Sequence, residues 1–183
     1  MTRNCLIVID VQNDFLDRLE DDCRAGLILK TNQLIDLFRA SGGPVIWVQQ
    51  LLSSDLSDAP LQIKDRRISV VIDGTAGAEI HSDFARDEED TVIVKKRYSA
   101  FFGTRLEQVL GDLDPDQVTL AGVNTHACVR TTAIDAYQRD MRVILASECI
   151  GSYDPEHARM SMAYMDKRIA VAMTNEQIAA LMT

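Results

Sequence analysis

Short apolar runs rich in Val and Ile alternate along the chain with longer segments in which apolar residues recur at helical spacing. This alternation is typical of a parallel β-sheet covered by helices on both faces, because each strand is buried on both sides and each connection returns through a helix. The pattern therefore predicts an α/β chain. Strands are expected over Cys5 to Val11, Pro44 to Gln50, Thr91 to Arg97, Gln117 to Val123, Arg142 to Ala146 and Arg168 to Met173.

Two long helices are predicted between these runs. The first, from Arg24 to Ala40, is followed by two glycines that favour its termination. Its inward stripe is expected to consist of Leu27, Leu34, Ile35 and Phe38. The second runs from Thr125 to Asp140, and its inward residues are expected to be Val129, Ala133, Ala136 and Tyr137. Shorter helices are predicted over Thr104 to Leu110, Pro155 to Met165 and Glu176 to Met182.

The stretch from Leu51 to Ala76 shows no clear periodicity. In α/β domains, a long connection after the carboxyl end of a strand usually lies at the functional edge of the sheet. We therefore expect an active-site loop or a lid here. With 183 residues and no visible repeat or interdomain linker, the chain is expected to form one domain over residues 1–183.

The charge balance argues against nucleic acid and anionic membranes as partners. The formal net charge is -9, whereas phosphate-rich partners are bound by clustered Lys and Arg. No apolar run reaches the roughly 20 residues of a membrane span, and the first run is too short for the core of a signal peptide. We expect a soluble, cytoplasmic protein whose partner is a small molecule.

The four cysteines are widely spaced and include no Cys-x-x-Cys pair, so neither a disulfide framework nor a zinc site is indicated. Cys5 and Cys149 lie in or beside apolar strands, where a buried, unreactive cysteine is the usual case. Cys128 falls instead in the first turn of a predicted helix, where free amides and the helix dipole stabilise a thiolate. Cys128 is therefore the candidate nucleophile.

Asp10 and a lysine pair end two other strands. Asp10 follows the apolar run of the first strand and reaches the carboxyl edge of the sheet, where such folds bind ligands, although an Asp that caps a turn is about as common. Lys95 and Lys96 close the third strand and face opposite sides, so only one can reach a given site, and periodicity does not choose between them. A solvent-exposed strand end is the more common outcome for either lysine. An acid, an amine and a sulfur around one pocket form an activated nucleophile.

Three segments carry a family resemblance. They are Asp10-Val11-Gln12-Asn13-Asp14-Phe15, Lys95-Lys96-Arg97-Tyr98-Ser99-Ala100-Phe101-Phe102-Gly103-Thr104 and Gly122-Val123-Asn124-Thr125-His126-Ala127-Cys128-Val129. Together they resemble the isochorismatase-like cysteine hydrolases, which include nicotinamidases, N-carbamoylsarcosine amidases, ureidoacrylate and biuret hydrolases, and isochorismatases proper. The resemblance extends from about Cys5 to Met173.

The resemblance implies a three-layer Rossmann-like fold with a six-stranded parallel sheet covered by helices on both faces. It also implies a catalytic triad of Asp10, Lys95 and Cys128, since the family's lysine lies three residues before the tyrosine. A non-proline cis peptide would precede Asn124, and the backbone amides of Asn124 and Cys128 would form the oxyanion hole. By resemblance alone, a homo-oligomer, a dimer or a tetramer, is expected.

The resemblance also implies a mechanism. Asp10 would take the Cys128 proton while Lys95 stabilises the charged pair, and thiolate attack on a carbonyl would give a tetrahedral oxyanion. Protonated Asp10 would then donate to the leaving amine, and water would hydrolyse the thioester. The expected substrate is a small amide, ureido or carbamoyl compound, and ammonia is an expected product.

Substrate contacts are expected from residues near the catalytic ones, namely Gln12, Phe15, Tyr98 and Phe101. Among the aromatic residues that follow the third strand, Phe101 ranks first, although such residues are more often simply core. Arg130 lies two residues after the nucleophile, but solvent exposure is the better expectation for it.

Departures from the family pattern bear on cofactors and substrate. Nicotinamidases carry an Asp and histidines after the second strand to bind a metal, whereas this stretch reads Gln49-Gln50-Leu51-Leu52-Ser53-Ser54, and the three histidines are far apart in sequence. We therefore expect neither a metal nor another cofactor. Isochorismatases cleave a vinyl ether without a cysteine nucleophile, so Cys128 favours C–N cleavage. Alternatives are a vinyl ether hydrolase, a catalytically silent oligomeric binding subunit, and a redox sensor, which would lack a resolving cysteine.

Overall fold

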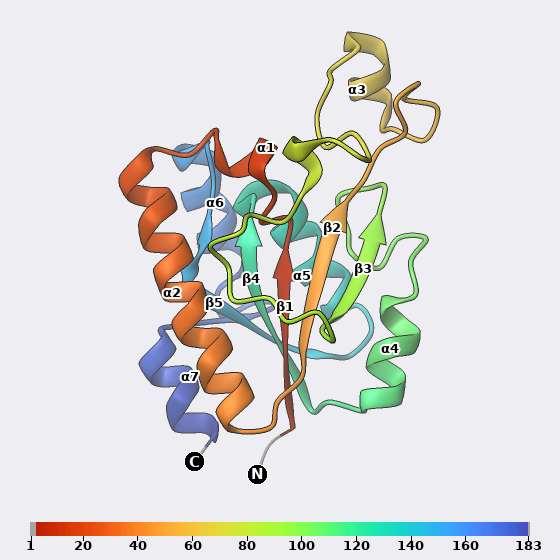
Figure 1. The fold of residues 1–183 in the computed structure, drawn as a ribbon. Helices are drawn as coiled ribbons and strands as arrows, with labels where there is room; N and C mark the ends of the chain where they lie inside the picture. Colours follow the sequence, from red (N-terminus) through yellow and green to blue (C-terminus); the bar gives the residue numbers. More distant parts are fainter. Residues whose placement is uncertain (1–2, 183) are drawn as a thin grey trace.

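The computed structural model describes residues 3–182, and its strands form one parallel sheet in the order β3-β2-β1-β4-β5-β6 (Figure 1). All residues of the central strand β1 are buried, as its unbroken apolar run predicts. The α/β class and the six-stranded parallel sheet are confirmed. The strands are β1 (Asn4–Ile9), β2 (Val45–Gln50), β3 (Thr91–Lys95), β4 (Gln117–Val123), β5 (Arg142–Gly151) and β6 (Val171–Met173).

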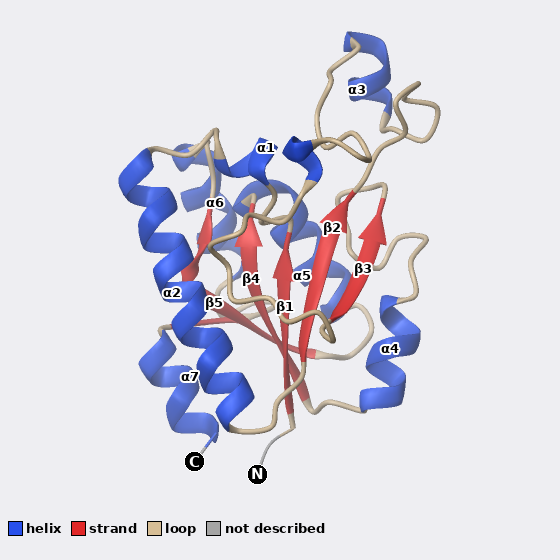
Figure 2. Ribbon diagram, in the orientation of Figure 1, coloured by secondary structure: helices blue, strands red, loops and turns tan. Residues whose placement is uncertain are grey.

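Helices cover both faces of the sheet and make three layers (Figure 2). One apolar core lies between the sheet and α2 and α7, and the other lies between the sheet and α4, α5 and α6. The helices are α1 (Asn13–Leu16), α2 (Asp21–Ala40), α3 (Leu61–Arg66), α4 (Leu106–Leu113), α5 (Arg130–Tyr137), α6 (Pro155–Met165) and α7 (Asn175–Met182). A 3-10 turn covers Ala76–Ala78, and a π-helical turn covers Thr125–Val129.

The helix α2 shows why periodicity predicts these elements well. Its expected inward stripe is buried on one side of the helix, and Gly42, with a φ of 73°, follows its end as expected. The buried residues of this stripe are Leu27, Leu34, Ile35 and Phe38. Although α2 has 20 residues, no helix within residues 3–182 is both long and apolar enough to cross a membrane.

Several predicted boundaries are wrong. The predicted helix from Thr125 to Asp140 is divided, because the π-helical turn precedes α5 and α5 ends at Tyr137. Tyr137 is half-exposed and does not face inward as expected, since it lies on the last turn beyond the edge of the core. The strand β5 continues five residues past Ala146, to Gly151, because its pairing with β4 resumes after an irregularity. The short helices α1 and α3 lack a periodic signal and are not predicted.

The order of the strands reverses between β1 and β4, which are hydrogen-bonded neighbours. In open α/β sheets this reversal opens a crevice at the carboxyl ends of the two strands. At this point the backbones approach so closely that a side chain at Gly122, whose φ is 114°, would collide with the backbone of Ile9. The crevice is therefore located directly beyond Ile9 and Val123.

Candidate active site

The residues Asp10, Lys95 and Cys128 meet at the carboxyl edge of the sheet. The ammonium Nζ of Lys95 lies 2.8 Å from Asp10 Oδ2 and 3.4 Å from Cys128 Sγ. Their exposed fractions are 1%, 1% and 4% respectively. Asp10 directly follows β1 in a left-handed conformation with a φ of 55°, which departs from the extended backbone of the strand.

Lys95 is held between the acid and the sulfur by two further acceptors. Its Nζ donates to Gln50 Oε1 at 3.2 Å and to the backbone oxygen of Arg97 at 2.9 Å. Lys96 points away from this cluster and pairs with Asp58 at 2.8 Å on the partly exposed side. The two lysines therefore face opposite sides, and Lys95 is the one that reaches the site.

The three ionisable groups shift one another's pKa values. Burial raises the pKa of the Asp10 carboxyl, although Lys95 and the Cys128 thiol act in the opposite direction. Burial alone would lower the pKa of Lys95, but the charges of Asp10 and Cys128 outweigh it and raise the pKa. Burial and the charge of Asp10 raise the pKa of the Cys128 thiol. Burial and the neighbouring carboxylate thus favour the thiol form of Cys128, in opposition to the helix start, which favours a thiolate.

The π-helical turn Thr125–Val129 holds Cys128 at the crevice. Its start is fixed by hydrogen bonds from the amides of Ala127 and Val129 to the backbone oxygen of Asn124, and from Thr125 Oγ1 to the oxygen of Gly151. The peptide bond between Val123 and Asn124 is cis, as the resemblance predicts. Within residues 3–182 the backbone amide of Asn124 donates no hydrogen bond and its buried Oδ1 has no partner. Polar groups of this turn are therefore available to a ligand.

A cavity of about 280 Å³ opens over the sulfur. Phe15 and Tyr98, two of the expected substrate contacts, contribute to its wall. Its lining residues are Phe15, Arg18, Gln50, Gln62, Ile63, Ile68, Val70, Tyr98, Asn124, His126, Ala127, Cys128, Thr131 and Tyr153. A space of this size is suited to a small molecule.

A family model of the isochorismatase domain matches residues 4–177. The chain belongs to the isochorismatase-like hydrolase family. Among its relatives, the phenazine biosynthesis protein PhzD1 of Pseudomonas aeruginosa is 30% identical over 176 residues, which are 96% of this chain and 84% of that protein.

Solved structures place the fold of this isochorismatase-like hydrolase in the same family. An isochorismatase family protein from Desulfovibrio vulgaris is 25% identical and superimposes with a TM-score of 0.89 over 99% of this chain and 98% of the other. The N-carbamoylsarcosine amidase of Thermoplasma acidophilum is 27% identical, with a TM-score of 0.81 over 96% of this chain and 98% of that one.

Two expected substrate contacts of the hydrolase lie elsewhere. The fully buried amide of Gln12 accepts from the amide of Gln50 at 2.8 Å and donates to the backbone oxygens of Gln50 and Ala78 at 2.8 and 2.6 Å, so it joins β1 to its neighbours and does not line the cavity. Phe101 is buried in the core beneath the guanidinium of Arg139, 4.6 Å from its ring. Neither Gln12 nor Phe101, both predicted to contact substrate, is therefore among the residues that line the cavity over Cys128.

The segment from Leu51 to Ala76 reaches the cavity, as expected for an active-site loop. Figure 1 shows its helix α3 beyond the carboxyl ends of β2 and β3. Side chains of this segment, Ile63, Ile68 and Val70, line the cavity. A separate apolar cluster of Leu52, Ala59, Val70, Val71 and Ala78 lies within and beneath it.

Asp58 ties this segment to the end of β3. Its carboxylate accepts from the amide and hydroxyl of Ser53, both at 2.9 Å, and pairs with Lys96, while its backbone oxygen accepts from Arg97 at 2.6 Å. Burial would raise the pKa of Asp58, but the hydrogen bonds from Lys96 and Ser53 outweigh it and lower the pKa to about 2. The segment is thereby attached to the two residues that follow Lys95.

His126 belongs to the π-helical turn and contributes to the site. It lines the cavity, its ring lies 6.0 Å from that of His157, and its Nδ1 is 2.8 Å from Ser152 Oγ. Within residues 3–182, no group of three or more His, Cys, Asp or Glu side chains is arranged to hold a metal ion. His126, Tyr153 and Arg18 are site residues that periodicity does not reveal, because they follow strand or helix ends.

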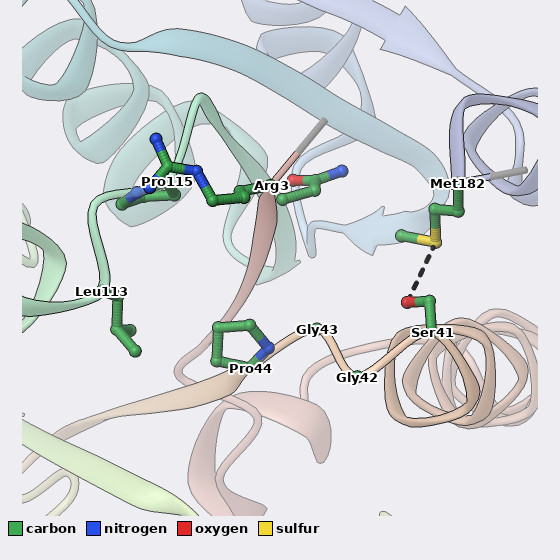
Figure 3. A pocket seen from close by; sticks show the side chains of 9 residues that line it. Arg3, Ser41, Gly42, Gly43, Pro44, Leu113, Pro115 and Met182 are labelled. Atoms are coloured by element: carbon green, nitrogen blue, oxygen red, sulfur yellow. Dashed lines mark hydrogen bonds between the residues drawn. The ribbon is translucent and has the colours of Figure 1, made fainter. Parts of the chain in front are cut away.

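A second cavity lies at the opposite, amino edge of the sheet (Figure 3). Its volume is about 290 Å³, and it is bordered by Arg3 and Asn4 at the start of β1 and by Gly43 and Pro44 before β2. Ser41 Oγ lies 3.7 Å from the sulfur of Met182 across its rim. This cavity is separated from Cys128 by the length of the central strands.

Proposed function

We propose that this hydrolase cleaves the C–N bond of a small amide or carbamoyl compound through a thioester on Cys128 and releases ammonia. The observation that carries the proposal is the placement of Lys95 Nζ in contact with both a buried carboxylate and a buried cysteine sulfur. This arrangement is that of a nucleophile with its own base and charge partner.

In the first step, Asp10 accepts the Sγ proton of Cys128 while the sulfur attacks the carbonyl carbon, so a C–S bond forms and the carbonyl electron pair moves onto oxygen. Lys95 touches both groups and offsets the negative charge as it passes from the carboxylate to the sulfur and the oxyanion. The backbone amides of Asn124 and Cys128 would hold the oxyanion, and one such donor contributes about 3–4 kcal/mol in comparable sites.

In the second step, the oxyanion collapses and the C–N bond breaks as protonated Asp10 donates its proton to the leaving nitrogen. Ammonia departs and the acyl or carbamoyl group remains on sulfur. Water then attacks the thioester, Asp10 takes a proton from it, and the same proton returns to sulfur when the C–S bond breaks. The raised pKa of Asp10 supports both the accepting and the donating role.

Similarity to an N-carbamoylsarcosine amidase over nearly the whole chain supports C–N cleavage. A second candidate is hydrolysis of a vinyl ether C–O bond, because the matching family model is that of the isochorismatase domain. The buried contact between Lys95 and Cys128 favours the first candidate, since a vinyl ether needs no cysteine nucleophile.

The test is a panel of primary amides, N-carbamoyl compounds, ureides, vinyl ethers and esters, with ammonia measured by a coupled assay and the intact protein mass measured after a rapid acid quench. We expect ammonia from at least one amide or carbamoyl compound, and a mass increase on Cys128 equal to its acyl or carbamoyl part.

Two outcomes would contradict the proposal. Efficient cleavage of a vinyl ether with neither ammonia nor a Cys128 adduct would establish the second candidate. A folded protein that turns over no member of the panel yet binds some of them would indicate a catalytically silent binding subunit.

A further inference from the structure

The lining of the active-site cavity carries one permanent charge. Among the described residues that line it, Arg18 is the cation, and neither Asp nor Glu is present. Burial lowers the pKa of His126, which favours the neutral form of this ring. Asp10 and Lys95 do not line the cavity and form an ion pair with each other. Arg18 is therefore the permanently charged side chain that a molecule in the cavity can contact directly.

The guanidinium of Arg18 is available to a ligand. Elsewhere in the chain Arg3, Arg24, Arg39 and Arg139 form ion pairs with carboxylates. Within residues 3–182, Arg18 forms no such pair, and its guanidinium carbon lies over the ring of Tyr153, 5.9 Å from the centroid. Although the chain has a net charge of -9 and Asp17 precedes Arg18, that carboxylate pairs with Arg24, and the donors of Arg18 are left for an anion.

The backbone under Arg18 is firmly placed. Arg18 follows α1, and its neighbours Leu16 and Leu19 are buried in the core with an amide-to-carbonyl hydrogen bond of 2.9 Å between them. The side chain of Arg18 is exposed and lies at the mouth of the cavity. The cation is therefore carried by an anchored turn.

The ring of Tyr153, which lies under Arg18, is connected through His126 to the π-helical turn that carries Cys128. Tyr153 packs edge-to-face on His126, with centroids 5.3 Å apart, and His126 is bonded to Ser152. Because His126 and Cys128 belong to the same π-helical turn, this stack connects the guanidinium to the turn that carries the sulfur. A preorganised cation of this kind loses less entropy when a ligand binds.

We propose that Arg18 determines specificity by binding a carboxylate of the substrate, at the end of the molecule away from the carbonyl that Cys128 attacks. A guanidinium offers paired donors that match the two oxygens of a carboxylate. One cation balances one negative charge, whereas a phosphate monoester carries about -1.5 to -2 near neutral pH. The inference rests on the proposed function for the reacting group and adds the charged end of the substrate.

The test uses protection of Cys128 from alkylation by iodoacetamide, which requires binding and no turnover. The probes are the half-amides of malonic, succinic and glutaric acid, each with one carboxylate and one primary amide, and the corresponding neutral diamides. Modification of Cys128 is followed by mass spectrometry of the Cys128 peptide. We expect the best half-amide to protect at about tenfold lower concentration than its diamide.

Arg18→Gln should abolish this preference for the half-amide, and Arg18→Lys should retain part of it. Arg86→Gln is the matched control, because it removes the same charge from an exposed position outside the cavity and should leave the preference unchanged. An equal preference in Arg18→Gln, or equal protection by diamides in the unmodified protein, would overturn the inference. Stronger protection by phosphonoacetamide than by malonic half-amide would overturn the choice of a carboxylate.

Ammonia release by the same variants separates this inference from the proposed function. For a carboxylated amide substrate, Arg18→Gln should raise KM about tenfold with a smaller change in kcat, and the neutral analogue should be unaffected. If no probe is hydrolysed but protection depends on Arg18, the proposed function fails and the inference stands. If neutral and anionic amides are hydrolysed equally well by both proteins, the inference fails and the proposed function stands.

Discussion

The two edges of the sheet carry cavities of similar volume, about 290 Å³ at the amino edge and about 280 Å³ at the carboxyl edge. Their polar groups differ. At the amino edge, Arg3 is paired with Asp114 and Asp116 at 2.8 and 3.4 Å. At the carboxyl edge, Arg18 has no carboxylate partner within the described residues, and the buried Oδ1 of Asn124 accepts no hydrogen bond.

This difference shows that volume alone does not identify a reactive site. One amide nitrogen at the amino edge, Asn4 Nδ2, also lacks a partner, but the oxygen of the same side chain accepts from Thr119 at 3.0 Å and the neighbouring cation is neutralised. The carboxyl edge combines unsatisfied polar groups with the buried Cys128, the proposed nucleophile, the buried carboxylate of Asp10 and an unpaired cation. A buried polar group without a hydrogen-bond partner lowers the stability of the fold, and such a group is expected where a bound ligand supplies the missing hydrogen bond.

The largest expected effect comes from comparing two buried cysteines. Cys128→Ala should lower the rate of ammonia release by about 10⁴-fold or more, since the nucleophile is removed. Cys149→Ala, in the opposite core with its Sγ 3.2 Å from Asn175 Oδ1, should retain activity within about twofold and lose roughly 1 kcal/mol of stability. Steady-state assays and thermal melts of both variants check this, and comparable losses of rate would refute the assignment of the nucleophile.

The next effect concerns the neighbouring lysines. Lys95→Ala leaves the buried carboxylate of Asp10 unpaired and should reduce the free energy of unfolding by about 3–5 kcal/mol, besides eliminating activity. Lys96→Ala removes a partly exposed pair and should cost about 0–1 kcal/mol. Urea denaturation measures both. The double variant Asp10→Asn with Lys95→Met should recover stability without activity, and a stable Lys95→Ala protein would disprove the coupling.

A smaller effect, confined to extremes of pH, follows from the raised pKa values. Asp10 must be ionised to accept the thiol proton, so kcat/KM should fall about tenfold per pH unit below an apparent pKa that lies above the ordinary Asp value of 3.8. Lys95 should stay charged to above its ordinary value of 10.5, which moves any alkaline loss to higher pH. Because the groups are coupled, the profile reports the cluster as a unit. An acid limb at or below the ordinary Asp value would contradict this.

The smallest effect is expected at the amino edge. Arg3→Gln removes two exposed ion pairs and should change ammonia release by less than about twofold, because exposed pairs contribute little and the cavity there is remote from sulfur. The melting temperature should shift only slightly. A large loss of activity in this variant would remove the distinction between the two edges.

Local signals in the sequence account for the elements that are predicted with their observed bounds. The helix α6 is one case, because Asp154 accepts from the amide of His157 and Pro155 occupies the first helical position. The strand β4 is another, because an unbroken apolar run leads to Asn124. Asp10 and Cys128 can be predicted from the sequence for the same reason, since Asp10 comes directly after such a strand and Cys128 lies in the turn that follows one.

The remaining parts depend on contacts between distant segments. Gln12 was expected to bind substrate, but its amide is occupied by the backbone of Gln50 and Ala78, which no local pattern reveals. Arg18 and Tyr153 are far apart in sequence, and their contact forms only in the folded chain. No periodic pattern therefore reveals either residue. The alternation of side chains along a strand does not choose between Lys95 and Lys96. That choice rests on the family pattern, in which the lysine lies three residues before the tyrosine.

The shape of the cavity and the proposed catalytic centre depend on different parts of the chain. Ile63, Ile68 and Val70 of the segment from Leu51 to Ala76 line the cavity, whereas the proposed catalytic residues Asp10, Lys95 and Cys128 lie at or after the ends of core strands. Mutation in this segment can therefore change the size and shape of accepted molecules while the bond-breaking centre is left intact. The fold thus allows new substrate ranges to evolve, or to be selected in a library at three positions, without rebuilding the chemistry.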